Sequence, residues 1–404
     1  MKDDLPTPEW KEAVWKDGIA NIDEHLNGLK KTPYSYPYRL HAEAINEVQR
    51  WFVEQTRLGI PVDFSNEGIH GLNHDRSTPL PAPISIGSTW DKALVREAGD
   101  IVGREAKALG DATWPESEII PTPMTDDEQQ SIRQVVEQAR RSDVIVAVVD
   151  EDAARCGENN SRTGLNLPGR QLQLVQALQA TGKPVVLVLI NGQPLTICWE
   201  NRYVPAILEA WFPNAWGGNA IAEALFGDYN PGGKLSVTFP KTIGQIEYNF
   251  PFKPGAHEEQ ASKGPNGYGK TSVYGALYPF GFRLSYTTFE YANLKVSPEK
   301  GHTQSDIHVS VDVKNTGSRA GDEVVQLYVK DLYSSVTTYV SKLRGFERIH
   351  LEPGETKTVQ FVLKPSDLEL LDKNMQWTVE PGDFKVCIGS SSEDIRLEKG
   401  FRLD

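Results

Sequence analysis

The sequence predicts a chain that combines an α/β part with an all-β part. Up to about residue 240, short apolar runs alternate with segments of helical period, which is typical of a mostly parallel sheet covered by helices. From residue 286 the period of the apolar residues changes to two, which is typical of a β-sandwich. The 404 residues are enough for two or three domains that each bury a core.

Residues 1–110 form the first region. An apolar stripe of helical period predicts a helix over residues 42–57, and residues 59–64 follow as a short buried strand. A second helix is expected over residues 90–109. The order helix, strand, loop, helix is that of a piece of an α/β layered fold.

Residues 111–250 form the second region. Thr125 and Glu128 have the spacing of a capping box, so a helix should begin directly after Thr125. Residues 144–149 are continuously apolar, as expected of a parallel strand that is covered on both faces. Further strands are predicted at residues 185–190, 206–211 and 235–239, with helices starting near Pro168 and over residues 220–226. The alternation predicts an α/β sandwich with a mostly parallel sheet.

Residues 286–404 form the third region. Ile307, Val309 and Val311 alternate with polar residues, and the same pattern recurs over residues 325–329, 359–363 and 384–388. Short alternating strands separated by turn residues indicate a β-sandwich of fibronectin type III kind. The intervening residues 251–285 are rich in glycine and polar residues and are expected to form a long loop and linker.

Composition excludes several classes of function. The formal net charge is -13 and no run of lysine and arginine occurs, which argues against a nucleic-acid partner. No apolar run approaches the ~20 residues of a membrane span, so no membrane partner is expected. Cys156, Cys198 and Cys387 are scattered without metal-ligand spacing, and neither a metal nor a cofactor is predicted. Residues 1–5 contain no signal-peptide pattern, which leaves both a cytoplasmic location and export with a lost leader open.

The densest group of polar residues follows the strand at residues 144–149. Residues 150–152 are all acidic, and Glu158 and Arg162 come shortly afterwards. Ligands of parallel sheets bind at the carboxyl ends of the strands, and carboxyl groups there are suited to general acid/base catalysis. A solvated loop in which Glu158 pairs with Arg162 explains the spacing equally well. A nucleotide-binding function is excluded, because no glycine-rich phosphate motif follows any strand.

Four segments carry a resemblance to a known family. Residues 158–171, 182–192, 225–235 and 278–287 resemble the glycoside hydrolase family 3 β-glucosidases, and the resemblance covers residues 118–404. It implies that Glu158 is the acid/base, that Glu151 is the second candidate for this role and that Arg162 helps to bind the sugar. The implied partner is a small β-linked saccharide or β-glycoside, and full-length relatives of this kind are expected in the periplasm or outside the cell.

The first region also resembles part of that family. Residues 59–72 are similar to an early strand-to-loop segment of its catalytic barrel, which implies that residues 1–110 are a remnant of a (β/α)8-like barrel. The resemblance assigns Glu67 to binding the sugar. His70 is a second candidate for a ligand contact, although a histidine at a strand end is more often structural.

The resemblance also indicates what is missing. A (β/α)8 barrel needs ~250 residues, and the chain contains neither the Lys-His nor the Asp-Trp dipeptide of the family, whose aspartate is the nucleophile. A retaining glycosidase requires two carboxyl groups ~5–5.5 Å apart. Asp63 and Asp75 are carboxylates of the first region without motif support. The expected function is therefore impaired hydrolysis of terminal β-D-glycosides. The alternative is a non-catalytic remnant with at most weak carbohydrate binding.

Smaller departures and the incomplete barrel lead to two structural expectations. Arg283 stands where the family usually has glycine, and residues 214–216 replace a glycine-rich turn, so a side chain is expected in left-handed backbone conformation. One or two βα units cannot close a barrel, and the uncovered apolar faces of residues 1–110 favour self-association.

Overall fold

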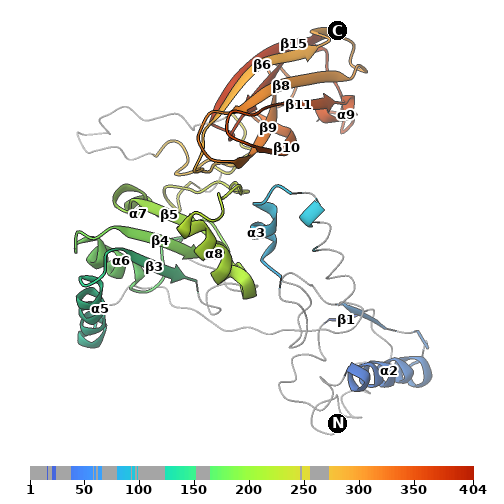
Figure 1. Cartoon of the computed structure of the whole chain (residues 1–404). Helices are drawn as coiled ribbons and strands as arrows, with labels where there is room; N and C mark the ends of the chain where they lie inside the picture. The colour runs from blue at the N-terminus through green and yellow to red at the C-terminus, as the bar shows by residue number, and fades with distance from the viewer. Residues whose placement is uncertain are drawn as a thin grey trace, which may run out of the picture.

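A computed structural model of the chain describes residues 16, 21–23, 38–57, 59–60, 62–65, 80–91, 93–95, 98, 123–151, 164–245, 248–254 and 273–404. Three parts follow one another in space (Figure 1). An N-terminal part contains helix α2, a central part contains a small parallel sheet with its helices, and the C-terminal part is a β-sandwich. The fold class predicted from the sequence, α/β followed by all-β, is confirmed.

The central domain contains a sheet of three parallel strands in the order β3-β4-β5, with β3 at Ile145–Asp150, β4 at Val185–Ile190 and β5 at Ala206–Glu209. Helix α5 (Asp126–Ala139) precedes β3, and α6 (Gln171–Gln179) and α7 (Cys198–Tyr203) make the two crossovers. The capping box at Thr125 is confirmed, because its Oγ1 accepts a hydrogen bond from the Glu128 amide at 3.2 Å.

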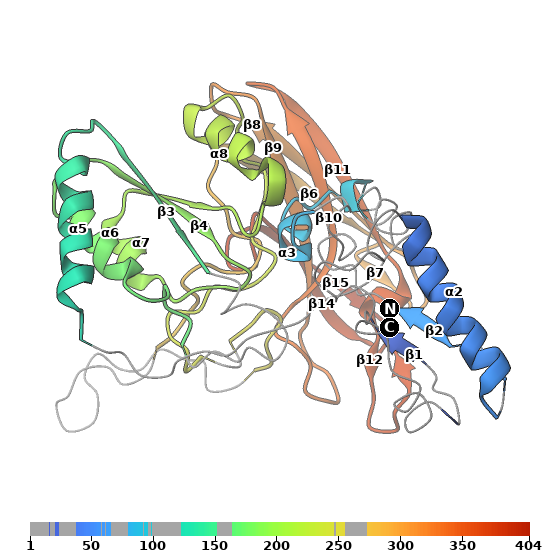
Figure 2. The same ribbon diagram turned by 90° about the horizontal axis from the view of Figure 1, so that it is seen from below.

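The two faces of β3 have different surroundings. Ile145, Ala147 and Val149 are buried beneath the helices, but Val146 and Val148 are 48% and 59% exposed. The order of β3, β4 and β5 across the sheet is the same as their order in the sequence. Right-handed crossovers therefore place the connecting helices α6 and α7 on the same face of the sheet. Figure 2 shows α5, α6 and α7 gathered on one side. The prediction that this strand is covered on both faces is therefore wrong.

A second strand prediction is also wrong. Residues 235–239 do not join the parallel sheet and make only a bridge between Phe239 and Tyr278. The Leu235 amide donates to the Phe282 carbonyl at 3.0 Å, so this segment pairs irregularly with the chain that leads into the sandwich.

The helix expected over residues 220–226 is confirmed as α8 (Gly217–Phe226), preceded by the 3-10 turn η1 (Asn214–Trp216). Asn214 has φ 59°, the left-handed conformation expected at the replaced glycine-rich turn.

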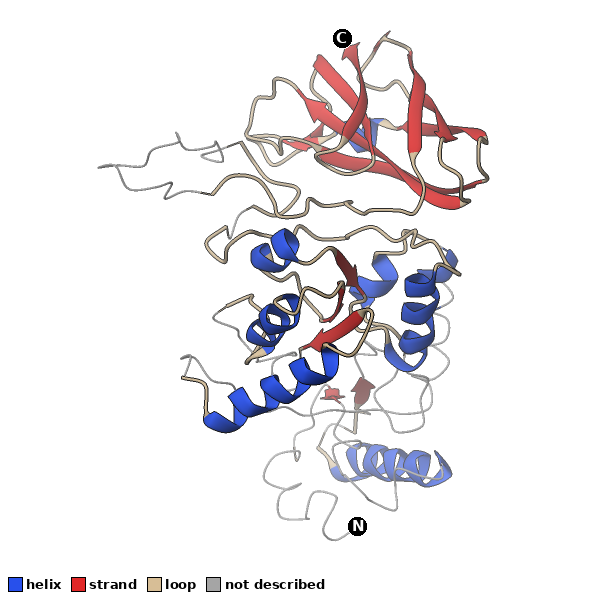
Figure 3. Cartoon of the chain, turned by 60° about the vertical axis from the view of Figure 1, so that its left-hand side comes forward, coloured by secondary structure: helices blue, strands red, loops and turns tan. Residues whose placement is uncertain are grey.

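The sandwich packs two layers against each other, whose strands pair antiparallel except for the short parallel pair of β15 and β7 (Figure 3). One has the order β10-β9-β14-β15-β7 and the other β11-β8-β6. Its core consists of residues that alternate along the strands, among them Val309, Val311, Leu327 and Val386. The period-two prediction is confirmed. The strands and the short helix are β6 Phe289–Ser297, β7 Lys300–Gly301, β8 Ile307–Asn315, β9 Gly321–Asp331, β10 Lys342–Leu351, β11 Thr356–Leu363, α9 Pro365–Leu368, β12 Leu370–Leu371, β13 Trp377–Thr378, β14 Gly382–Gly389 and β15 Ile395–Leu403.

The described residues of the N-terminal part include a βαβ unit. Strands β1 (Asn21–Asp23) and β2 (Asp63–Ser65) pair in parallel, and α2 (Tyr38–Gln55) connects them. Val48 and Phe52 of α2 bury themselves against Val62. The helix predicted over residues 42–57 is thus confirmed, whereas most of the helix predicted over residues 90–109 lies outside the described residues.

Residues 80–91, which include α3 (Pro83–Gly87), join the N-terminal part to the rest of the chain. The Trp90 ring packs between Phe280 and Phe346, with ring centroids 5.5 and 4.8 Å away, and its Nε1 donates to the Lys234 carbonyl at 3.0 Å. The Trp211 indole donates in turn to Ser88 Oγ at 3.0 Å. A segment from the predicted barrel remnant is therefore part of the junction between the other two domains.

We expect Trp90→Ala to destabilise the chain by about 3–5 kcal/mol, because it removes a large buried ring and one buried hydrogen bond. Urea denaturation followed by tryptophan fluorescence and circular dichroism measures the change. Trp377→Ala is the matched control, since this ring is 69% exposed, and its stability should stay within about 0.5 kcal/mol of the parent. Equal losses in the two variants would contradict the packing described for Trp90.

Candidate functional site

The polar side chains of interest lie where the three parallel strands end. Glu151 follows β3 directly, Asn191 follows β4, and Glu209 is the last residue of β5. Parallel strands end at the same edge of the sheet, so these residues are neighbours although they are far apart in the sequence.

Glu151 fastens the end of β3 to the turn after β4. Its side chain is buried, its Oε2 accepts a hydrogen bond from the Gly192 amide at 3.1 Å, and its Oε1 accepts one from Gln193 Nε2 at 2.9 Å. A Cβ at Gly192 would lie 2.6 Å from the ring of Phe212, so only glycine fits this turn. The carboxylate is therefore held by two donors in a fixed geometry.

Gln171 ties together the two ends of the acidic loop. Its Nε2 donates to the Asp150 carbonyl at 2.7 Å, and its Oε1 accepts from the Asp150 amide at 2.9 Å. The side-chain amide of Gln171 thus makes the same two hydrogen bonds to β3 that a peptide group of a neighbouring strand would make. Because the chain leaves the sheet at Glu151 and begins α6 at Gln171, the intervening loop starts and ends at one point.

The returning half of this loop has two further attachments. The Thr196 amide donates to the Leu165 carbonyl at 2.8 Å, which joins the loop to the segment after β4. Arg170 contacts α5 through an ion pair of 3.2 Å to Glu128 and donates to the Pro123 carbonyl at 2.9 Å. The loop is therefore attached both to the parallel sheet and to helix α5.

Glu209 is a carboxyl group that the sequence patterns did not single out. Its Oε1 accepts from the Trp211 amide at 2.9 Å, and its Oε2 faces Asn191 Nδ2 at 3.4 Å. Burial raises the pKa of Glu209 to about 8, although both donors lower it. At neutral pH it is mainly a neutral acid. An acidic residue at the carboxyl end of an apolar run was the available signal, because that position lies at the ligand-binding edge.

Comparison with known families gives the affiliation of the chain. Residues 16–286 match the model of the glycosyl hydrolase family 3 C-terminal domain, and residues 323–392 match the fibronectin type III-like domain. The chain belongs to glycosyl hydrolase family 3. The first match crosses the boundary between residues 110 and 111, so the division of this family 3 chain into 1–110, 111–250, 251–285 and 286–404 stays a prediction.

Curated relatives of the family 3 chain include a periplasmic beta-glucosidase of Salmonella typhimurium, which is 43% identical over 273 residues. A beta-xylosidase of Formosa agariphila is also 43% identical, over 265 residues. Each match includes 66% of this chain but only 35% and 36% of the relative. The chain thus spans about a third of the length of these relatives.

A solved structure has a fold similar to that of this chain. The crystal structure of a beta-glucosidase from Listeria innocua in complex with glucose matches with a TM-score of 0.64 at 32% identity. The match covers 70% of this chain and 39% of the other.

The structure places one of the five site residues predicted for this family 3 chain. Glu158 and Arg162 lie within residues 152–163, and Glu67 and His70 lie within residues 66–79, all outside the described residues. Glu151 is described, and both of its oxygens accept hydrogen bonds from the turn after β4. This arrangement favours a positioning role for Glu151, because a general acid must offer its proton to the substrate.

A cavity in the described part of the chain lies away from this sheet edge. A hollow of about 350 Å³ is lined by Asp322, Arg348 and His350 together with Trp90 and Phe346. Arg348 and His350 both pair with Asp322, so these three side chains are already engaged with one another. We therefore place the candidate site at the sheet edge. Among the described residues no group of three or more metal-binding side chains occurs, and no helix is long and apolar enough to cross a membrane.

Glu209 should make the stability of the chain depend on pH. Its folded-state pKa of about 8 exceeds the ordinary 4.5, so the unfolded chain releases this proton first and stability falls as pH rises between these values. Glu209→Gln imitates the protonated form. The stability of this variant relative to the parent should therefore increase from about pH 5 to about pH 8, as measured by urea denaturation at several pH values. Glu290→Gln, at an exposed position of β6, is the control, and a difference independent of pH for Glu209→Gln would contradict the assignment.

Proposed function

We propose that this chain carries the acid/base side of a retaining β-glycosidase site, that its reaction is the hydrolysis of terminal β-D-glycosides and that Glu158 is the acid/base. The observation that supports this most directly is the loop of residues 151–170, which begins and ends at the carboxyl edge of the parallel sheet. Gln171 and Glu151 fix its ends. Relatives named beta-glucosidase and beta-xylosidase support the same reaction class.

In the proposed reaction, Glu158 donates its proton to the glycosidic oxygen while the bond between C1 and this oxygen breaks. In a retaining enzyme it then takes a proton from the water that attacks the glycosyl intermediate. Glu151 would position the loop, as its two hydrogen bonds to the turn after β4 suggest. Glu67, His70 and Arg162 are proposed to bind the sugar.

The sequence offers no clear candidate for the second carboxyl group of such a site. Retention requires a nucleophile ~5–5.5 Å from the acid/base, and no residue of the sequence matches the family's Asp-Trp motif. We therefore propose that the activity is impaired. Removal of the nucleophile of a serine hydrolase slows it by a factor on the order of 10⁶.

The proposed substrate is a small β-linked glucoside or xyloside. The names of the relatives indicate both sugars, and the solved Listeria innocua relative is in complex with glucose. The net charge of -13 fits a neutral sugar better than a polyanion.

A β-glucosidase assay tests the proposal. The purified chain and the Listeria innocua enzyme would be compared on a nitrophenyl β-glucoside, and we expect the chain to be slower by a factor on the order of 10⁴ or more. Glu158→Gln should lower any residual turnover by a further factor of roughly 10²–10⁴, the usual contribution of a positioned acid/base. Glu151→Gln, the matched control, should have a smaller effect on the rate than Glu158→Gln.

The outcomes separate the alternatives. An unchanged rate in Glu158→Gln with a large loss in Glu151→Gln would move the acid/base role to Glu151. Turnover within about tenfold of the Listeria innocua enzyme would mean that another carboxylate acts as nucleophile. A residual rate that neither variant changes, together with at most weak binding of glucose in calorimetric titration, would favour the non-catalytic remnant.

A further inference from the structure

Asn191 lies at the centre of the carboxyl edge of the parallel sheet, because it follows the middle strand β4. The residue is 1% exposed. Its Nδ2 donates to the Gln193 carbonyl at 2.8 Å and to Glu209 Oε2 at 3.4 Å. One amide group therefore contacts both the turn after β4 and the end of β5.

The turn that Asn191 contacts also holds the end of β3. The Gly192 amide donates to Glu151 Oε2 at 3.1 Å, and Gln193 Nε2 donates to Glu151 Oε1 at 2.9 Å. The bond from Asn191 to the Gln193 carbonyl spans both donor residues, so it restricts the backbone that aims them. The ring of Phe212 lies against Gly192 and limits movement of the turn on that side. A chain of hydrogen bonds thus runs from β5 through Asn191 to Glu151.

The two ends of the Asn191 amide differ in how they are used. Within the described part of the chain, Asn191 Oδ1 is buried without a hydrogen-bond partner. A buried acceptor without a partner costs free energy that an apolar side chain would not lose, so stability alone does not explain an asparagine here. Its Nδ2 donates to two acceptors, and we infer that these two bonds are its purpose.

Glu151 is the point at which the proposed acid/base loop leaves the sheet. A general acid has to keep its proton within hydrogen-bond reach of the glycosidic oxygen, and small displacements of such a group are costly. The side chains that fix the end of the loop therefore contribute to the reaction without touching the substrate.

We propose that Asn191 is a positioning residue of the glycosidase site, which holds the turn of residues 191–193 in the shape that fastens Glu151 and thereby fixes the start of the acid/base loop. Glu209 anchors the Asn191 amide from the neighbouring strand. This inference rests on the proposed function, in which the loop of residues 151–170 carries the acid/base.

Limited trypsin digestion tests the effect on the loop. The loop contains Arg155 and Arg162, and their cleavage can be compared with cleavage after the exposed Arg141 of the same domain. Asn191→Ala should raise the relative cleavage of the loop on the order of tenfold, because local opening becomes easier when two hydrogen bonds are lost. Asn201→Ala, at an exposed position of α7, is the matched control and should not change it.

A double variant tests whether Asn191 acts through the turn. Gln193→Leu removes the donor to Glu151 but keeps the carbonyl that Asn191 binds. Combining it with Asn191→Ala should raise cleavage of the loop little more than Asn191→Ala alone, since both changes interrupt one chain of hydrogen bonds. Arg170→Ala removes an independent attachment of the loop, so its effect should multiply with that of Asn191→Ala.

The dependence of the residual rate on the leaving group tests the effect on catalysis. Dinitrophenolate needs less help from an acid than nitrophenolate does, so a displaced acid/base slows the nitrophenyl β-glucoside more. Asn191→Ala should lower kcat for the nitrophenyl β-glucoside roughly tenfold more than for the dinitrophenyl β-glucoside. A loss of folded protein would lower both rates by the same factor.

The outcomes separate this inference from the proposed function. Loop cleavage that Asn191→Ala leaves unchanged, or that rises by independent factors in the double variant with Gln193→Leu, would overturn the positioning role of Asn191. A loosened loop with an equal loss of rate on both glucosides would contradict the acid/base assignment of the loop. If no turnover is measurable, the digestion alone decides whether Asn191 fixes the loop.

Discussion

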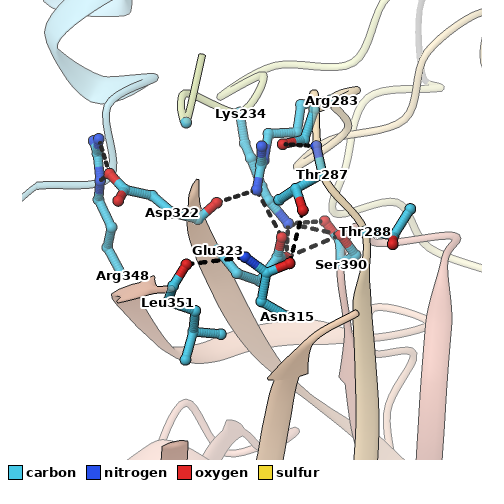
Figure 4. Close-up of polar contacts among 12 residues, drawn as sticks. Lys234, Arg283, Thr287, Thr288, Asn315, Asp322, Glu323, Arg348, Leu351 and Ser390 are labelled. Carbon is cyan, nitrogen blue, oxygen red and sulfur yellow. Dashed lines mark hydrogen bonds and ion pairs between the residues drawn. The ribbon is translucent and has the colours of Figure 1, made fainter. Parts of the chain in front are cut away.

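The arrangement of the domains depends on one buried lysine. Lys234 lies in the segment after α8, and its side chain is 0% exposed. Its Nζ donates to Glu323 Oε1 and to the Ser390 carbonyl, both at 2.6 Å, and to Ser390 Oγ at 2.8 Å, so all three of its protons are used (Figure 4). Its backbone amide donates to Ser88 and its carbonyl accepts from Trp90. One residue therefore joins the central domain, the sandwich and the N-terminal segment.

The electrostatic balance around Lys234 explains a departure from the family pattern. Burial lowers the pKa of Lys234 to about 8, and the opposite charge of Glu323 limits this decrease. Burial alone would raise the pKa of Glu323, but Lys234 and Arg283 keep it below its ordinary value. Arg283, which replaces the usual glycine, donates to Glu323 Oε2 at 2.7 Å and to the Pro231 carbonyl at 3.0 Å. The larger side chain is thus accommodated as a second cation between the domains.

The features that the sequence predicted correctly are local ones. The capping box of Thr125 and the alternating valines of β8 depend on spacings of a few residues. The exposure of one face of β3 depends on which side of the sheet the crossover helices cover. The Lys234–Glu323 pair joins residues that are 89 apart in the sequence. No local sequence pattern predicts either feature. The sequence predicted an acidic loop after the strand at residues 144–149, but the amide of Gln171, which joins the two ends of this loop, became visible only in three dimensions.

Differential scanning calorimetry of Lys234→Met is the most direct test of the claim that this lysine joins the domains. The account predicts that the central domain and the sandwich of the parent unfold in one transition. In Lys234→Met the unfolding temperature should decrease by roughly 5–15 °C and the two domains should unfold separately, because removing one partner of a buried ion pair costs about 3–5 kcal/mol. Lys300→Met, at an exposed position, should behave like the parent. A single transition at the parent's temperature in Lys234→Met would contradict the account.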